Sequence, residues 1–415
     1  MRLFTISSSL HSEIEQDAAK EPFVLQVRQS VEGAGESFEF CGGDFARYRG
    51  TAEDVVYVRT GGTEGIFKSL FFGDKAVCTP GPFVRLLTSG RSNSLAASME
   101  ILSFLRQRGF RGEILHGEEL GSAPAQGPSG LVRPISAHPE LGLRLGVLGA
   151  PSDWLISSAV DYGRAREVLG VSLEDIPMTE LLEAYSSRTQ VPELGLKPLN
   201  APRYGKPISS KSFEDALRLY GSLEDIIAQK GLDGLSLRCF DLLTAIGNTG
   251  CMGLSLLNSR GRIGTCEGDI PAMLSMAVAR AVAGNSGFQV NLSQVRRGAQ
   301  ELLFAHCTVP LDIVEDYCYD THFESGIGVA VHGTLPTGPA TLLKIGPGLD
   351  AYVAEDVLVK ANCYEDGLCR TQVLVGGRDA AHFDALSSYL TTEPLANHHI
   401  LIPGHHAGAI RKLLG

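Results

Sequence analysis

The sequence predicts an α/β protein with two N-terminal doubly wound, Rossmann-like α/β domains and a C-terminal, mostly antiparallel β-barrel-like domain. In the first third of the 415 residues, short apolar strands alternate with amphipathic helices, which is typical of a parallel sheet. The same alternation restarts near residue 143, and beyond about residue 285 short strands are separated by Gly and Pro turns. The length also favours two or three domains. We expect domains at residues 1–142, 143–285 and 286–415.

The first domain shows the alternation most clearly between residues 54 and 115. Residues 54–59 are β-branched and apolar and run into Gly61-Gly62-Thr63-Glu64, which predicts a buried strand, a turn and a helix start. That turn lacks the GxGxxG and GK[ST] patterns of nucleotide-phosphate loops, so tight packing is the simpler interpretation. A strand at 83–87, a helix at 93–108 and a strand at 111–115 follow.

The later domains are predicted from similar signals. In the second domain we expect strands at 143–149 and 234–240 and helices at 213–230 and 271–283. In the third we expect strands at 328–332, 341–345, 372–375 and 399–402, with a closing helix at 407–414. Stretches rich in Gly or Pro, at 121–130 and 194–210, predict loops.

Composition excludes several classes of function. The 36 basic and 47 acidic residues give a net charge of -11, which argues against nucleic-acid or anionic-membrane partners. The nine cysteines show no CxxC spacing, so we expect reduced thiols and a cytoplasmic protein. We find neither a signal peptide nor an apolar run of about 18 residues.

The segment Glu267-Gly268-Asp269 is the strongest candidate for chemistry. Two carboxylates this close can hold a divalent cation or act as acid and base on a bound sugar. The alternative is that they stabilise the N-terminus of the following helix, and Pro271 in its first turn favours this interpretation for Asp269. Glu267 is therefore the stronger catalytic candidate.

Histidines downstream are candidate ligands or proton carriers: His306, His322, His398 and His399. The alternative for each is a structural or surface role. His398 and His399 open a predicted strand, so their rings should face opposite ways and at most one should enter a site directly.

Three further side chains are candidates for substrate binding. Arg370 suits sugar oxygens or a carboxylate, and Glu324 lies in the polar segment with His322. The alternative is a structural ion pair between Glu324 and Arg370. Trp154, the only tryptophan, could stack on a sugar, although core packing is the simpler interpretation.

Taken in chain order, these segments resemble the L-fucose/L-arabinose isomerase superfamily, specifically the fucose isomerase-like proteins, over most of the chain. No single motif is decisive, but their order together is fairly specific. The N-terminal matches are Gly61-Gly62-Thr63-Glu64, Asn93-Ser94-Leu95, Pro151-Ser152-Asp153-Trp154 and Arg238-Cys239-Phe240. The stronger matches are Cys266-Glu267-Gly268-Asp269, His306-Cys307-Thr308-Val309-Pro310, His322-Phe323-Glu324-Ser325-Gly326, Cys369-Arg370-Thr371-Gln372 and Asn397-His398-His399.

The resemblance implies aldose–ketose isomerisation, an intramolecular oxidoreduction through an enediol, usually with Mn²⁺. It also implies a cytoplasmic homo-oligomer, often trimer-based. Glu267 would be a metal ligand and acid–base residue, and one of His398 and His399 the C-terminal ligand. We assign Asp269 and His306 to catalysis beside Glu267, and Arg370, Glu324, His322 and Trp154 to sugar binding.

The chain departs from this family at Asn291, which occupies the position of the second acidic ligand. An amide can coordinate weakly but cannot accept a proton as a general base. Either Asp269 or Glu324 replaces the missing carboxylate, or the chemistry differs, or metal binding is lost. The alternatives are therefore a sugar-binding homologue with altered catalysis and a metal-dependent lyase or epimerase.

Overall fold

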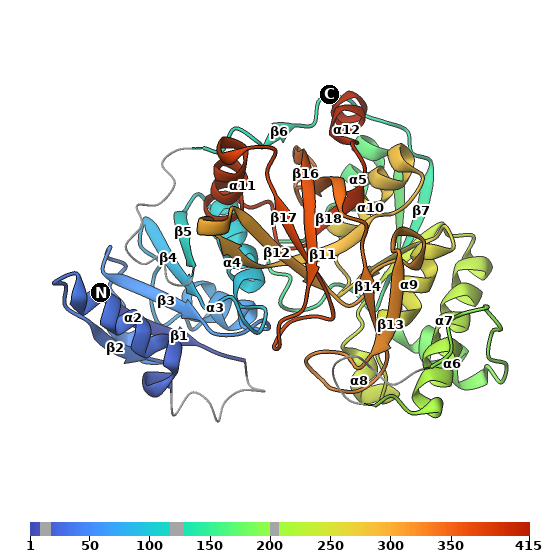
Figure 1. The fold of residues 1–415 in the computed structure, drawn as a ribbon, viewed down its shortest axis with the longest axis horizontal. Helices are drawn as coiled ribbons and strands as arrows, with labels where there is room; N and C mark the ends of the chain where they lie inside the picture. Colours follow the sequence, from blue (N-terminus) through green and yellow to red (C-terminus); the bar gives the residue numbers. More distant parts are fainter. Residues whose placement is uncertain (9–17, 117–127, 200–206) are drawn as a thin grey trace.

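The first sheet is formed by five parallel strands of the described residues, in the order β2-β1-β3-β4-β5. The computed structural model describes residues 1–8, 18–116, 128–199 and 207–415 (Figure 1). The strands are β1 (Arg2–Ile6), β2 (Glu39–Gly42), β3 (Asp54–Val58), β4 (Phe83–Thr88) and β5 (Arg111–His116). The strands predicted at 54–59, 83–87 and 111–115 are confirmed.

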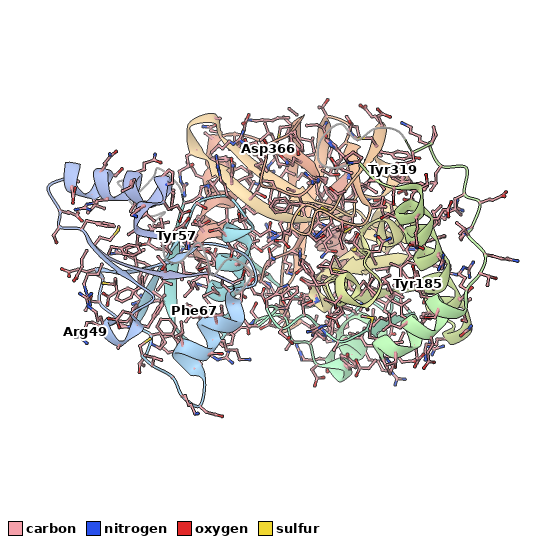
Figure 2. The ribbon with its side chains drawn as sticks, turned by 90° about the horizontal axis from the view of Figure 1, so that it is seen from below. Arg49, Tyr57, Phe67, Tyr185, Tyr319 and Asp366 are labelled. Atoms are coloured by element: carbon pink, nitrogen blue, oxygen red, sulfur yellow. The ribbon has the colours of Figure 1, made fainter. Side chains whose placement is uncertain are left out.

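Helices cover both faces of this sheet. On one face, α2 (Pro22–Gly33) packs its valines against apolar residues of β1 and β3, including Tyr57. On the other face, α3 (Glu64–Phe72) and α4 (Ser94–Gln107) pack against the sheet through apolar residues that include Phe67. Figure 2 labels Tyr57 and Phe67 among the side chains. The helix predicted at 93–108 is α4.

A second parallel sheet has the strand order β10-β9-β7-β8. Its strands are β7 (Leu143–Leu148), β8 (Val171–Ile176), β9 (Gly234–Leu237) and β10 (Ile263–Cys266). The accompanying helices are α5 (Tyr162–Leu169), α6 (Met178–Ser187), α7 (Ser210–Lys230), α8 (Asp241–Ala245), α9 (Cys251–Ser259) and α10 (Ile270–Ala283). The helices predicted at 213–230 and 271–283 are α7 and α10.

The third sheet is antiparallel, and its pairings close into a ring: β15-β18-β11-β12-β17-β16, with β16 pairing back to β15. The ring strands are β11 (Phe288–Arg296), β12 (Glu301–His306), β15 (Gly338–Ile345), β16 (Ala351–Cys363), β17 (Thr371–Gly376) and β18 (His399–Pro403). The short strand β6 (Arg133–Pro134) adds to β16. Near the ring lie α11 (Ala380–Thr392) and α12 (Ala407–Leu414) (Figure 1).

One predicted strand lies outside the ring, and two predicted loops lie partly outside the described residues. The strand expected at 328–332 forms part of a separate hairpin of β13 (Asp316–Asp320) and β14 (Ala330–Thr334), not of the ring. The predicted loops at 121–130 and 194–210 fall in part outside the described residues, at 121–127 and 200–206.

Apolar cores run between the three sheets. One contains Val56 of the first sheet together with Phe304 of the ring, and another joins Met273 of α10 to Ile400 of β18. Such shared cores fix the sheets against one another, so that loops from all three can meet at one place. Because the cores run across the proposed limits, the domain boundaries at 142 and 285 stay predictions. None of the helices in the described part of the chain has the length and apolarity needed to cross a membrane.

Candidate active site

Glu267 lies in the tight turn between β10 and α10. Its backbone φ is 65°, in the left-handed region that non-glycine residues seldom adopt. The next residue, Gly268, has a φ of 72°, and a Cβ there would lie 2.5 Å from the carbonyl oxygen of Ala150. The Ser152 N–H donates to the Glu267 carbonyl oxygen at 2.9 Å. Close backbone packing therefore fixes the turn that presents this carboxylate.

A row of rings begins at the Glu267 side chain. Trp154 donates its indole N–H to Glu267 Oε2 at 2.6 Å. The Trp154 ring meets Phe240 edge-on at 4.9 Å, and Phe240 meets His322 in the same way at 5.6 Å. Trp154 and His322, both predicted to bind substrate, are thus connected to Glu267 through direct contacts.

Asp269 both caps a helix and orients a histidine. Its Oδ1 accepts the Ala272 N–H at the start of α10, at 2.7 Å, and its Oδ2 lies 2.8 Å from His398 Nδ1. Burial alone would raise the pKa of Asp269, but Lys344 and the hydrogen bond to His398 outweigh it and hold the pKa at about 2. An ionised Asp269 holds a proton on Nδ1 of His398, so Nε2 is the ring nitrogen left to take up either a proton or a cation.

Glu267, His306 and His398 form a group that could hold a metal ion, because one ligand atom from each lies within 4.8 Å of the others. Glu267 Oε1 and His398 Nε2 are 3.7 Å apart. Within the described residues, this buried Nε2 has no hydrogen-bond partner. One carboxylate and two imidazoles suit a divalent cation, so the residues present fit a metal.

The two histidines of this group differ in their electrostatic surroundings. Burial lowers the pKa of His306 to about 3, so its ring is neutral, and its Nδ1 lies 2.9 Å from Thr308 Oγ1. Burial also opposes the charging of His398, but Glu267 and Asp269 outweigh it and raise the pKa of His398. The site therefore attracts positive charge at His398, whether a proton or a cation.

His399 and Asn291 are placed differently from His398. The His399 ring contacts the Tyr389 hydroxyl through Nε2, at 2.9 Å, and the Asn397 carbonyl oxygen through Nδ1, at 2.8 Å, so it lies outside the metal group. The strands β11 and β18 are antiparallel, and Val290 pairs with His399. The next residue along each strand from this pair is therefore Asn291 on one side and His398 on the other. Asn291 Oδ1 is buried and, in the part of the chain that is described, has no hydrogen-bond partner.

Glu324 and Arg370 do not pair with each other, so the ion pair considered from the sequence is wrong. The exposed Glu324 accepts a hydrogen bond from Asn93 Nδ2 at 2.8 Å, while Arg370 Nε lies 3.7 Å from Asp320. Arg370 also donates to the Thr321 carbonyl oxygen at 2.7 Å. The guanidinium is 9% exposed and faces the hairpin, which explains why it does not reach Glu324.

Sequence reasoning missed Glu100, a fully buried carboxylate in α4. Its Oε1 accepts hydrogen bonds from the Ser157 N–H at 2.8 Å and the Ser158 hydroxyl at 3.0 Å. Its Oε2 accepts the Asn397 N–H at 3.2 Å. Glu100 thus joins α4 to the segment after Trp154 and to the segment before His398. The signal available in the sequence was a single acidic residue in a predicted helix whose other residues from 94 to 105 are all apolar or small.

Two more buried ionisable residues, Glu64 and Lys344, were not among the predicted site residues. Glu64 opens α3 directly after the Gly-Gly turn, and its Oε2 has no partner among the described residues. Burial raises the pKa of Glu64, and the carboxylates of Glu100 and Glu267 raise it further, which favours the neutral acid. Lys344 in β15 is fully buried and supplies positive charge near Asp269 and Glu100.

The chain is similar to curated proteins named sulfoquinovose isomerase. The chain is 26% identical over 230 residues to a sulfoquinovose isomerase of Clostridium sp. (strain MSTE9), covering 52% of this chain and 47% of that protein. It is 24% identical over 220 residues to the sulfoquinovose isomerases of Priestia aryabhattai and Priestia megaterium, covering 51% of this chain and 49% of each. The chain therefore matches about half the length of these curated relatives. No protein-family model matches the chain.

Proposed function

We propose that this chain is an aldose–ketose isomerase that acts on a sugar or sugar derivative through an enediol intermediate. The observation that supports this most is the grouping of Glu267, His306 and His398 beside the Trp154 ring. The names of the matched relatives support sugar isomerisation at a coarse level.

The reaction moves a proton from one carbon to its neighbour, next to a carbonyl group. Such a carbon is a weak acid, so the step needs a positioned base and stabilisation of the negative charge that develops on oxygen. We assign the proton transfer to Glu267. The Trp154 N–H holds Oε2 of this carboxylate, and the backbone turn limits its movement.

We propose that Glu267, His306 and His398 hold a divalent cation, with Mn²⁺ as the first candidate. When bound, the cation would polarise the sugar oxygens beside the reacting carbons. Asp269 keeps His398 in the tautomer that offers Nε2, and burial keeps His306 neutral. Asn291 has no acid–base function in this proposal because its amide cannot accept a proton.

Sugar hydroxyl groups would be bound on the side of the aromatic row. His322 and Glu324 come from the same loop, and Asn93 holds Glu324 at 2.8 Å. Glu64, whose environment favours the neutral acid, could donate to a sugar oxygen. Arg370 is held by Thr321 and Asp320, so we propose that it supports this loop and does not itself grip the substrate.

The direct test is to incubate the metal-reconstituted full chain with a panel of aldoses, neutral and sulfonated, in D₂O. We expect deuterium at C2 and formation of the matching ketose, read by NMR. Binding of a sugar without exchange would instead favour the alternative of a sugar-binding homologue with altered catalysis. Asn291, which stands in place of the second acidic ligand, is the reason for considering that alternative. Exchange that yields another product would favour an epimerase or lyase.

The sugar, the metal, the trimer-based homo-oligomer and the cytoplasmic location stay predictions. Light scattering of the purified chain checks the assembly, and metal analysis of protein purified without added metal checks the ion.

A further inference from the structure

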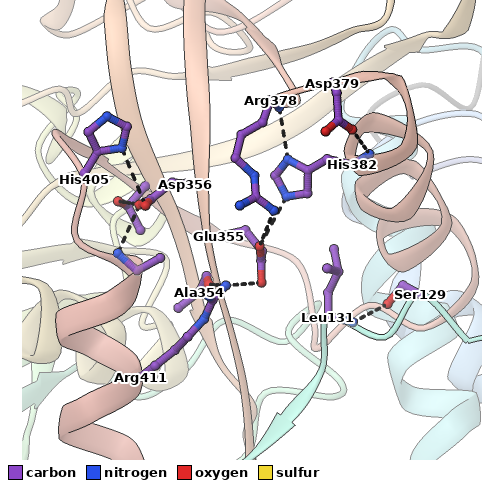
Figure 3. Close-up of polar contacts among 12 residues, drawn as sticks. Ser129, Leu131, Ala354, Glu355, Asp356, Arg378, Asp379, His382, His405 and Arg411 are labelled. Atoms are coloured by element: carbon purple, nitrogen blue, oxygen red, sulfur yellow. Dashed lines mark hydrogen bonds and ion pairs between the residues drawn. The ribbon is translucent and has the colours of Figure 1, made fainter.

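A second charged cluster surrounds Glu355 in the β16 strand of the ring (Figure 3). The Glu355 side chain is 2% exposed. Guanidinium nitrogens of Arg133 and Arg378 lie 3.8 and 3.9 Å from its carboxylate oxygens, and Arg411 hydrogen-bonds to it. We call Arg133, Arg378 and Arg411 the arginine cluster. They come from β6, the segment before α11, and α12, so distant parts of the chain converge here.

The neighbouring histidine adds no positive charge to the arginine cluster. His382 Nδ1 accepts the Arg378 N–H at 3.1 Å, so this nitrogen carries no proton. Its Nε2–H therefore donates to Glu355 Oε2, at 3.2 Å. Asp379 accepts the His382 backbone N–H at the start of α11. Even when Asp379 is counted with Glu355, three guanidinium groups exceed two carboxylates in a chain whose net charge is -11.

The arginine cluster keeps hydrogen-bonding capacity that Glu355 does not use. At 3.8 and 3.9 Å, Arg133 and Arg378 attract Glu355 electrostatically but lie beyond hydrogen-bond distance. Their side chains are 41% and 62% exposed, whereas Arg411 is 32% exposed. The buried carboxylate thus lies beneath guanidinium groups that reach the surface.

We propose that the arginine cluster binds a small tetrahedral oxyanion, either inorganic phosphate or the phosphate group of an ester. Guanidinium forks match the paired oxygens of a phosphate group and form charge-assisted hydrogen bonds with it. Glu355 holds the cluster together before the anion arrives, which lowers the cost of ordering these long side chains on binding. The anion in turn balances the excess positive charge.

This site is separate from the candidate active site. Cys363 follows Glu355 by eight positions along β16, which is roughly 26 Å at the usual rise of a strand. Cys363 pairs with Gln372, whose neighbour Thr371 pairs with His306. The arginine cluster therefore lies toward the other end of the ring from Glu267, and the inference does not depend on the proposed function.

The test is isothermal titration of the full chain with inorganic phosphate and, in a second arm, with glucose 6-phosphate, in NaCl of matched ionic strength. We expect binding by the wild type and affinity weakened by about tenfold or more in the Arg133→Gln/Arg378→Gln variant. Arg411 is not substituted in this variant because it hydrogen-bonds directly to Glu355. Tighter binding of the ester than of phosphate would identify an ester as the ligand, and equal binding would identify free phosphate.

Arg28→Gln is the matched control, because Arg28 is 55% exposed and pairs with Glu32 on the surface of α2. It should bind phosphate as the wild type does. Arg378→Lys keeps the positive charge but removes the guanidinium fork, so we expect its phosphate affinity to lie between those of the wild type and the double variant. This single variant also tests the proposal if the double variant fails to fold. No binding by the wild type, or equal binding by the wild type and Arg378→Lys and double variants, would overturn the proposal.

Discussion

His398 Nδ1 lies 2.8 Å from Oδ2 of Asp269, and both side chains are completely buried. The same aspartate accepts the Ala272 N–H through its other oxygen, so the start of α10 and the orientation of the histidine depend on one carboxylate. Helix capping and contact with the candidate site, which the sequence presented as alternatives for Asp269, are thus combined in one residue.

Replacing this aspartate by its amide should weaken metal binding without removing the helix cap. In Asp269→Asn, the amide oxygen can still accept the Ala272 N–H, but the charge that supports His398 is lost. We expect metal affinity to fall by about 10–100-fold, with a smaller loss of stability. Titration calorimetry and urea unfolding measure the two effects. Asp379→Asn at the start of α11 is the matched control, and an unchanged metal affinity in Asp269→Asn would contradict this role.

Metal affinity should also depend on pH through His398. Burial opposes its charging, but Glu267 and Asp269 raise its pKa above the usual 6.5, so a proton occupies the metal-free site as the pH falls. His306, with a pKa of about 3, contributes no such competition near neutral pH. Affinity should fall by about tenfold per pH unit below the pKa of His398. Calorimetry in two buffers of different ionisation enthalpy should show proton release on binding at pH 6, and an affinity independent of pH would contradict the assignment.

Glu100 should act as a positioning residue for the site. In Glu100→Gln, Oε1 can still accept from Ser157, but the new amide places a donor opposite the Asn397 N–H. We expect a loss of stability of about 1–3 kcal/mol and weaker metal binding, because Asn397 precedes His398.

Urea unfolding and metal titration of Glu100→Gln test this expectation. The control is Ser103→Ala, which removes the acceptor of the Ala396 N–H and leaves Glu100 in place. Lower stability together with wild-type metal affinity would mean that Glu100 only supports packing.

Arg370 should contribute to stability more than to substrate binding. Burial raises the pKa of Asp320 to about 6, with Arg370 acting against this rise. In Arg370→Gln the buried carboxyl loses its counter-charge, and we expect a destabilisation of about 3 kcal/mol at pH 7.

The Asp320–Arg370 pair also determines how the loss of stability in Arg370→Gln changes with pH. A carboxyl group with a raised pKa penalises the folded state increasingly as the pH rises, so the loss in Arg370→Gln should be smaller at pH 5 than at pH 7. Adding Asp320→Asn should recover part of the stability. An unchanged unfolding curve with a raised KM would instead indicate that Arg370 contacts the sugar.

Periodicity and turn residues predicted much of the fold. Residues 54–59, 93–108 and 213–230 were identified because strand and helix patterns are local properties of the sequence. Ring closure by the β15–β16 pairing was not predictable in detail, since it joins strands whose register depends on the whole barrel.

In the candidate site, too, local features could be predicted from the sequence and contacts between distant segments could not. Glu267 and Asp269 are marked by the turn that contains them, and strand alternation places the rings of His398 and His399 on opposite sides. The roles of Glu100 and the Asp320–Arg370 pair arise from contacts between distant segments. Neither follows from spacing along the chain.

The most direct measurement compares wild type and Glu267→Gln for deuterium entry at C2 of the aldose that the wild type converts, in D₂O and with equal metal content. The account predicts that exchange in the variant falls by about 100-fold or more, while its circular dichroism spectrum stays that of the wild type. Exchange within about tenfold of wild type would contradict the assignment of Glu267 as the residue that moves the proton.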